Sequence, residues 1–245
     1  MNRVASTFSF ILILVFLVVG MTSCENKYAE EETTIFDQYY VFEPKTLLDS
    51  LQNANTNTFT LVDKRPEFLP VNQQLPFPWH QADYFNIATT LYNSIGKPLQ
   101  DWQLNNMDFR SHCNKIDEGF QNGRFEFFTV VKENESESRL SRFVDIDTRG
   151  NFVHVNETKY DPNIENWAVV DLEKLKISAE QAFQIAEQNG GKEIRESVNN
   201  DCAVSLVLAP DNARYKGWAV IYTQDSGTPI FHIQVDPYTG EIRSP

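Results

Sequence analysis

Two aspartates, an arginine and a glycine stand close together at Asp145, Asp147, Arg149 and Gly150, in the order that opens a calcium-binding loop. Such a loop takes further oxygen ligands from its fifth and twelfth positions. This chain has Arg149 and Asn156 at those two places, so ligands are lost and a positive charge stands where the cation would bind. Asp and Gly are also typical of tight turns. We therefore favour a turn between two strands over a calcium site.

The four histidines are His80, His112, His154 and His232, and none has the compact spacing of a zinc site. His154 and His232 fall in alternating segments, which predicts that each lies on a half-exposed face of a sheet. The sequence also lacks a nucleophile elbow, a phosphate-binding P-loop and a Cys-x-x-Cys pair. We therefore predict no catalytic residue, no metal site and no cofactor.

The N-terminal segment has the organisation of an export signal. Arg3 gives it a positive start, and an unbroken apolar run extends from Phe10 to Val19. That run is shorter than the roughly 18 apolar residues that a membrane-spanning helix needs. We predict that residues 1–23 are removed and do not belong to the fold.

Cys24 follows the small residues of Gly20-Met21-Thr22-Ser23, directly after the apolar run. This arrangement resembles the lipobox of bacterial lipoproteins. The resemblance implies that Cys24 receives a diacylglycerol thioether and becomes the first mature residue. The alternative is an ordinary signal cut near Ser23, which would leave Cys24 as an isolated thiol. A lipid on Cys24 predicts that the protein is anchored to the cell membrane and faces the extracytoplasmic side.

Two cysteines then remain, Cys113 and Cys202. An exported compartment permits disulfides, and two thiols are the smallest set that can pair. A bridge between them would close a loop of roughly 90 residues, worth on the order of 4 kcal/mol. We favour this disulfide over the alternative, which is two separate buried thiols.

The composition excludes several classes of partner. The chain has 245 residues, with 21 Lys and Arg against 34 Asp and Glu, and a formal net charge of −13. Binding to nucleic acid needs clustered basic residues, so we expect no nucleic acid partner. An acidic protein is also repelled by anionic lipid headgroups, so a lipid tether would have to hold it at the membrane.

The C-terminal third predicts a helix followed by antiparallel strands. Ser178 to Gln181 forms a capping box, and Ala179, Ala182, Phe183 and Ala186 then share one helical face. Gly190 and Gly191 are expected to end that helix. Three strands follow, over Cys202 to Leu208, Trp218 to Tyr222 and Ile230 to Val235.

The middle of the chain repeats this plan. An apolar helical stripe consists of Tyr84, Ile87, Ala88, Leu91 and Ile95. Alternating segments then predict strands over Met107 to Cys113, Phe125 to Val131 and Phe143 to Asp147. Two copies of one unit in tandem are therefore the internal repeat that the sequence predicts.

A helix followed by a hairpin that ends in Ile233-Gln-Val-Asp-Pro-Tyr-Thr-Gly-Glu-Ile242 resembles the PepSY family. The resemblance implies an α+β fold of two cystatin-like units, each a helix on an antiparallel sheet, after an irregular N-terminal arm. The expected organisation is a signal peptide (1–23), a tether (24–34), the arm (35–79), a degenerate first repeat (80–160), a linker (161–176) and a second repeat (177–245).

The resemblance brings no catalytic residues, and it implies peptidase inhibition or regulation for some members of the family. We therefore expect a lipid-anchored, non-catalytic binding or regulatory protein that acts on a protein partner, such as an envelope peptidase. A hydrolase with a dispersed active site and a structural spacer are the alternatives. Tyr222 and His232, near the mixed face of the last hairpin, are the candidate binding residues. The alternative, which we favour, is that this face packs against the other repeat or against the 35–79 arm, because exposed apolar patches are rare on monomers.

Overall fold

The computed structural model describes residues 31–44, 46–47, 59–74, 80–94, 101–133, 136–161, 169–209, 217–225 and 227–243. The predicted signal peptide and Cys24 lie outside these ranges. No helix within them is long and apolar enough to cross a membrane.

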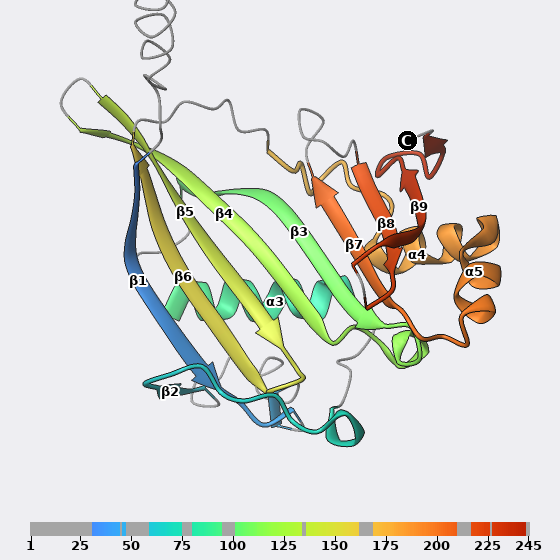
Figure 1. The fold of residues 1–245 in the computed structure, drawn as a ribbon. Helices are drawn as coiled ribbons and strands as arrows, with labels where there is room; N and C mark the ends of the chain where they lie inside the picture. Colours follow the sequence, from blue (N-terminus) through green and yellow to red (C-terminus); the bar gives the residue numbers. More distant parts are fainter. Residues whose placement is uncertain are drawn as a thin grey trace, which may run out of the picture.

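The described part of the chain is dominated by one antiparallel sheet of ten strands (Figure 1). Its strand order is β10-β9-β8-β7-β3-β4-β5-β6-β1-β2. Both edge strands are very short: within the described ranges, β2 pairs only with Tyr39–Val41 of β1, and β10 only with Gln234 and Val235 of β9. The strands are β1 (Glu31–Val41), β2 (Thr60–Val62), β3 (Gln103–His112), β4 (Asn122–Glu133), β5 (Ser136–Asp147), β6 (Phe152–Asp161), β7 (Ala203–Ala209), β8 (Gly217–Thr223), β9 (Pro229–Val235) and β10 (Ile242–Arg243).

Two helical segments pack on the sheet. The first is α3 (Gln81–Ser94), and the second runs through α4 (Ala179–Ala186), η5 (Glu187–Gly191) and α5 (Lys192–Ser197). Short 3-10 turns form η2 (Val71–Gln73) and η4 (Ile116–Glu118). The capping box before α4 is confirmed, because Ser178 and Gln181 each accept a backbone hydrogen bond from the other. The predicted end at the two glycines is wrong: Gly190, at a φ of 101°, kinks the helix, which resumes as α5.

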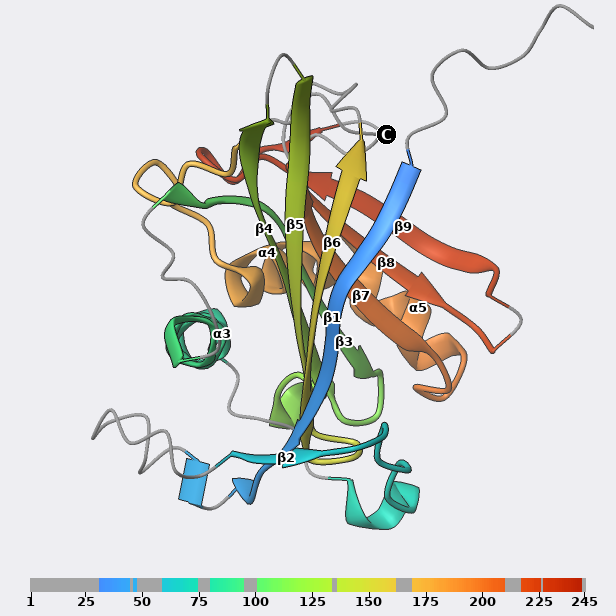
Figure 2. The same cartoon turned by 90° about the vertical axis from the view of Figure 1, so that its left-hand side faces the viewer.

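Both helical segments lie on the same face of the sheet. Tyr84 of α3 contacts Phe109 of β3, and Phe183 of α4 contacts Tyr222 of β8. Phe109 in turn contacts Trp218, so the residues under the two helices form one continuous hydrophobic core. Figure 2 shows α3 on one side of β4, β5 and β6, and within the described ranges no helix covers the opposite face of these strands.

The expected pair of separate helix-and-sheet units in tandem is therefore wrong. The two segments predicted as repeats are joined where β3 pairs with β7, from Met107 opposite Leu208 to His112 opposite Ala203. The physical reason is that each three- or four-stranded sheet would otherwise expose the edge of its first strand. Pairing the two edges satisfies both backbones and merges the two cores into one sheet-dominated fold.

The expected irregular N-terminal arm is also partly wrong. Residues 31–41 form β1, a long strand that pairs with β6 from Glu31 opposite Asp161 to Val41 opposite Phe152. A short strand within the arm, β2, pairs with the end of β1. The β1 segment contains neither Pro nor Asn, and its Thr, Tyr and Phe residues favour strands.

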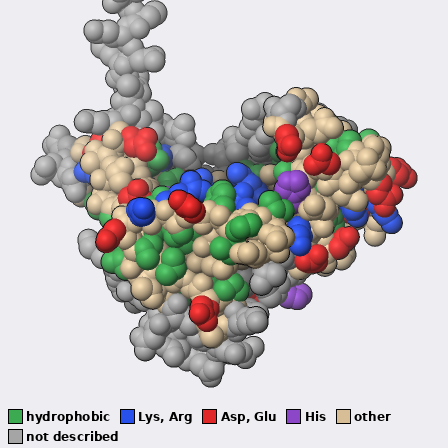
Figure 3. Space-filling view, turned by 60° about the horizontal axis from the view of Figure 1, so that its bottom comes forward, with side chains coloured by type: hydrophobic (Ala, Val, Ile, Leu, Met, Phe, Trp, Pro, Cys, Tyr) green, Lys and Arg blue, Asp and Glu red, His purple; other side chains and the backbone are tan. Residues whose placement is uncertain are grey.

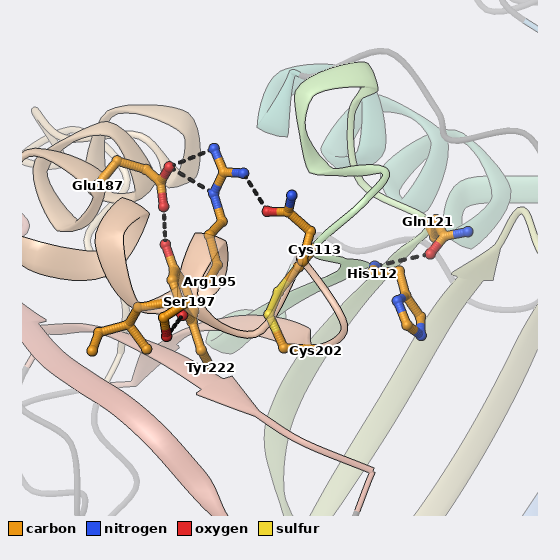
Figure 4. The surroundings of a disulfide bond; sticks show 10 residues. His112, Cys113, Gln121, Glu187, Arg195, Ser197, Cys202 and Tyr222 are labelled. Carbon is orange, nitrogen blue, oxygen red and sulfur yellow. Dashed lines mark hydrogen bonds and ion pairs between the residues drawn. A yellow bond between two sulfur atoms is a disulfide. The ribbon is translucent and has the colours of Figure 1, made fainter.

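A disulfide joins Cys113 to Cys202, as the sequence predicted (Figure 4). The two cysteines follow β3 and precede β7, and their Cα atoms are 5.3 Å apart. The backbone N–H of Cys113 also donates a hydrogen bond to the carbonyl of Cys202 at 2.8 Å. The bridge therefore closes the end of the strand pair that unites the two halves of the sheet.

Candidate functional site

Charged side chains gather on the face of the sheet opposite the helices, which we call the helix-free face. Strand alternation places Asp108 and Arg110 of β3, Arg124 of β4 and Asp145 of β5 on this face, while Phe109 points to the helices. In the view of Figure 3, basic side chains form a band across the surface, with acidic side chains next to them. A surface of this kind, on strands held rigidly by their neighbours, can position charged groups for a ligand.

A cavity of about 330 Å³ opens on this face, and we call it the arginine pocket. This volume is at the lower end of the range for small-molecule sites. Its walls come from β1, β3, β4, β5 and β6 and from the turns beside them. The lining residues are Tyr39, Arg65, Arg110, Asn122, Arg124, Phe143, Asp145, Asp147, Arg149, Phe152 and His154.

Four of the ten arginines in the chain line this one cavity. Arg149 is held in place: it donates to both oxygens of Asp147, with Nη2 to Oδ2 at 2.6 Å, and its guanidinium lies over Phe68 at 4.5 Å. Arg110 is held in a similar way, because its Nε donates to Asp108 Oδ2 at 2.9 Å. These two arginines line the pocket with part of their hydrogen-bonding capacity already used.

Arg65 and Arg124 have more capacity left. Arg65 lies over the rings of Phe68 and Phe152, at 5.0 and 5.7 Å, and no carboxylate within the described ranges pairs with it. The Nε of Arg124 is 3.6 Å from Asp145 Oδ1, which is too long for a good hydrogen bond. Arg124 also lies 4.5 Å over the ring of Phe143. Both guanidinium groups can therefore donate to a ligand without first losing a strong partner.

His154 lies at the wall of the pocket between two carboxylates. Its Nε2 contacts the Asp37 carboxylate, and its Nδ1 is 3.6 Å from Asp145 Oδ2. The imidazole ring stacks on Tyr39 with the ring centroids 4.3 Å apart. Burial lowers the pKa of His154, but the carboxylates of Asp145 and Asp37, which attract the charged ring and accept hydrogen bonds from it, outweigh this effect, so the pKa is raised above its ordinary value.

Asp108 lies beneath Arg110 and is only 6% exposed. One of its oxygens accepts from Arg110, while the buried Oδ1 has no hydrogen-bond donor within the described ranges. Burial raises the pKa of Asp108, although Arg110 opposes this effect. Because Oδ1 is enclosed, a ligand cannot reach it, and the role of Asp108 is to orient Arg110.

The two predicted binding residues lie on opposite faces of the sheet. Tyr222 is fully buried under the second helix, where its hydroxyl donates to Glu187 Oε1 at 2.5 Å (Figure 4). Burial and this hydrogen bond raise the pKa of Tyr222 well above its ordinary value. His232 is opposite Ile221 in β8, half-buried on the other face. Tyr222 and His232 therefore cannot contact one ligand together.

The residues first considered for calcium do form the predicted turn. Residues 148–151 connect β5 to β6, and the backbone N–H of Arg149 donates to Asp147 Oδ1 at 2.9 Å. Arg149 pairs with Asp147 there. Within the described ranges, no three His, Cys, Asp or Glu side chains are grouped so that they could hold a metal ion.

Sequence reasoning found part of this site and missed the rest. The sequence analysis assigned Asp145, Asp147 and Arg149 to a turn. It placed His154 on a half-exposed face of the sheet. Arg65, Arg110 and Arg124 were missed, since they lie on three segments that share no local motif. One signal was present: on strands β3 and β4, Arg110 and Arg124 alternate with buried aromatic residues, which indicates a charged face opposite the core.

Comparison with known proteins gives no functional assignment. No family model matches the sequence, and no curated protein matches it. Among solved structures, one similar chain is the "Dehydratase domain from CurK module of Curacin polyketide synthase", at 9% sequence identity and a TM-score of 0.16. The similarity covers 68% of this chain and 82% of that domain. A TM-score this low shows no shared fold, and nothing is drawn from it.

Proposed function

We propose that this protein is a lipid-anchored, extracytoplasmic binding protein without catalytic activity, and that the arginine pocket binds an anionic group of its ligand. The guanidinium fork of arginine matches the geometry of carboxylate, phosphate and sulfate groups. The observation that carries the proposal is the placement of four arginines around one cavity in a chain with a net charge of −13. Long-range repulsion alone would keep anions away from such a protein.

The balance of charge in the pocket supports a single anionic group. The lining holds four arginines against Asp145 and Asp147, so its formal charge is +2 with His154 neutral. Asp108 and Asp37 lie just outside the lining, where Asp108 pairs with Arg110 and Asp37 contacts His154. Arg65 and Arg124 are therefore the two residues we assign to the ligand, while the paired Arg110 and Arg149 support them.

The lining also supports a binding role over hydrolysis by a nucleophile. Among the described residues, the lining contains no Ser, Thr, Cys or Lys, four of the side chains that form covalent intermediates. The alternative of a hydrolase with a dispersed active site has one observation in its favour. His154 between Asp37 and Asp145 has the form of an oriented general base.

Ligand titration tests the proposal. Sulfate and succinate serve as probes for the tetrahedral and carboxylate groups, and isothermal titration calorimetry gives their Kd. We expect Arg65→Gln to weaken binding about tenfold or more, because a charge-assisted hydrogen bond contributes about 1.5–3 kcal/mol. Lys64→Gln is the matched control: it removes the same charge from the neighbouring, exposed residue.

Three results would overturn the proposal. The first is that the wild-type protein binds neither probe, and the second is that Lys64→Gln weakens binding as much as Arg65→Gln does. The third concerns catalysis: hydrolysis of peptide or ester substrates by the purified protein, abolished by His154→Gln, would support the hydrolase instead. Identification of proteins that co-purify from membranes then tests for an envelope peptidase as the partner.

A further inference from the structure

Four side chains form a continuous row across the helix-free face, one from each of four neighbouring strands. Asp37 of β1 contacts His154 of β6, His154 is 3.6 Å from Asp145 of β5, and Asp145 is 3.6 Å from Arg124 of β4. The row ends at one of the two arginines assigned to the ligand. Because the strands are paired directly in the order β4-β5-β6-β1, these distances are held by the sheet itself.

The protonation state of His154 decides how Asp145 is shared. When His154 is neutral, Arg124 is the nearest cationic partner of the Asp145 carboxylate among the described residues, and that carboxylate repels an incoming anion. When His154 is protonated, it becomes a second cationic partner of Asp145. The negative charge of Asp145 is then neutralised from the other side, and its repulsion of an anion at Arg124 is weakened.

We propose that protonation of His154 raises the affinity of the arginine pocket for its anionic ligand, so that the protein binds the ligand more tightly in acidic surroundings. This inference rests on the proposed function. A protonated His154 adds one positive charge to the lining, and an anion in the pocket would in turn favour the protonated ring. By thermodynamic linkage, protonation of His154 strengthens anion binding by the same free energy by which the bound anion strengthens protonation.

The charged and titratable groups around His154 come from every element that packs against it. Asp37 and Tyr39 face it from β1, and Asp145 faces it from β5. The remaining charged groups of the pocket are Arg65, Arg110, Arg124, Asp147 and Arg149. The pKa of His154 is raised, so the folded protein holds this proton more tightly than a free imidazole does.

Sulfate is the suitable probe, since its own charge stays constant in the range where histidine titrates. Calorimetric titration of the full chain at about pH 5.5 and about pH 8.5 brackets the titration of histidine. We expect the wild-type protein to bind sulfate at least about fivefold more tightly at the lower pH. His154→Gln keeps a neutral polar side chain, and we expect it to bind sulfate with little dependence on pH. His80→Gln is the matched control: His80 is exposed, does not line the pocket, and should leave the pH dependence unchanged.

Asp37→Asn is a second variant that tests the row directly. It removes a carboxylate that stabilises the charged imidazole, so the rise in sulfate affinity should move to lower pH without being lost. NMR titration of the His154 ring, with and without sulfate, gives the reciprocal measurement, and we expect sulfate to raise the pKa of His154. Circular dichroism of each variant confirms that it is folded.

The outcomes separate this inference from the proposed function. If the wild-type protein binds no sulfate at either pH, the proposed function itself fails. If sulfate binds with equal affinity at both values, or if His154→Gln keeps the full pH dependence, the pocket stands and the role of His154 is overturned. If His154→Gln keeps the pH dependence of sulfate binding and His80→Gln loses it, the effect belongs to His80, and the proposed role of His154 is overturned.

Discussion

Gln81 and Glu180 cap each other's helices. The side-chain oxygen of Gln81, the first residue of α3, accepts a hydrogen bond from the backbone N–H of Ala179, the first residue of α4, at 2.9 Å. In return, the carboxylate of Glu180 accepts from the backbone N–H of Gln81. The N–H groups in the first turn of a helix have no intrahelical partners. Each half of the protein therefore supplies a hydrogen-bond acceptor for an N–H group at the start of the other half's helix.

Removal of these caps should weaken the junction between the two halves. We expect Gln81→Ala and Glu180→Ala each to lower the free energy of unfolding by about 1 kcal/mol, as for other lost N-caps. Chemical denaturation measures the change. Gln184→Ala, on the exposed face of α4, is the control and should cost little. A cost at Gln184 equal to that at Gln81 would show that the caps contribute nothing specific.

The disulfide should make a larger contribution. Cys113 and Cys202 are 89 residues apart in sequence, and closing a loop of that size is worth on the order of 4 kcal/mol. We expect the double variant Cys113→Ser, Cys202→Ser to unfold at a much lower guanidinium concentration than the oxidised wild-type protein. Reduced wild-type protein should resemble the double variant. Two free thiols in the untreated, denatured wild-type protein would contradict the bridge.

Gly123 should not tolerate a side chain. A Cβ atom there would lie 2.4 Å from Cδ1 of Tyr84, which packs across β4 and donates its hydroxyl to the Phe120 carbonyl at 2.6 Å. Tyr84 is fully buried and cannot move aside easily. We expect Gly123→Ala to lower the free energy of unfolding by about 1–3 kcal/mol, as overpacking usually does. Gly227→Asn is the control for steric space: nothing lies near the added side chain there, and Asn tolerates the φ of 75° better than most residues. Equal stability of the two variants would disprove the close packing.

The ion pairs of His154 should make stability depend on pH. Because the pKa of His154 is higher in the folded protein than its ordinary value, the folded state binds a proton more tightly than the unfolded chain does. The resulting stabilisation is fully present below the unfolded pKa of about 6.5 and is lost as pH rises through the folded pKa. Thermal unfolding of His154→Gln should therefore show a larger loss of Tm near pH 5.5 than at pH 8.5. A loss of equal size at both values would contradict the raised pKa.

The lipid anchor is tested at Cys24. We expect Cys24→Ser to release soluble protein or to leave an unprocessed precursor, because a serine cannot carry the thioether-linked diacylglycerol. Membrane fractionation and the mass of the mature N-terminus measure the outcome. Protein that stays at the membrane with its signal removed would show that another feature attaches it.

The sequence by itself predicted most of the local elements and favoured the pairing of the two cysteines, which the structure confirms. Apolar periodicity predicted α3, α4 and the strands around Phe109, Phe125 and Leu206. An element that buries one face repeats its apolar residues with its own period, and this repeat is visible in a short stretch of sequence. The capping box at Ser178 and the turn at Asp147 were predicted for the same reason: a side chain that bonds to backbone two or three residues away needs no other part of the chain.

Only the tertiary structure decided how these elements join and which charges meet. The pairing of β3 with β7 brings together strands about a hundred residues apart, and no local pattern states which edges will pair. The same holds for the arginine pocket, where Arg65, Arg110 and Arg124 arrive from three separate segments. Strand alternation predicts the face on which a residue lies, but the order of strands in the sheet decides its neighbours, and that order depends on long-range contacts that satisfy backbone edges and bury a shared core.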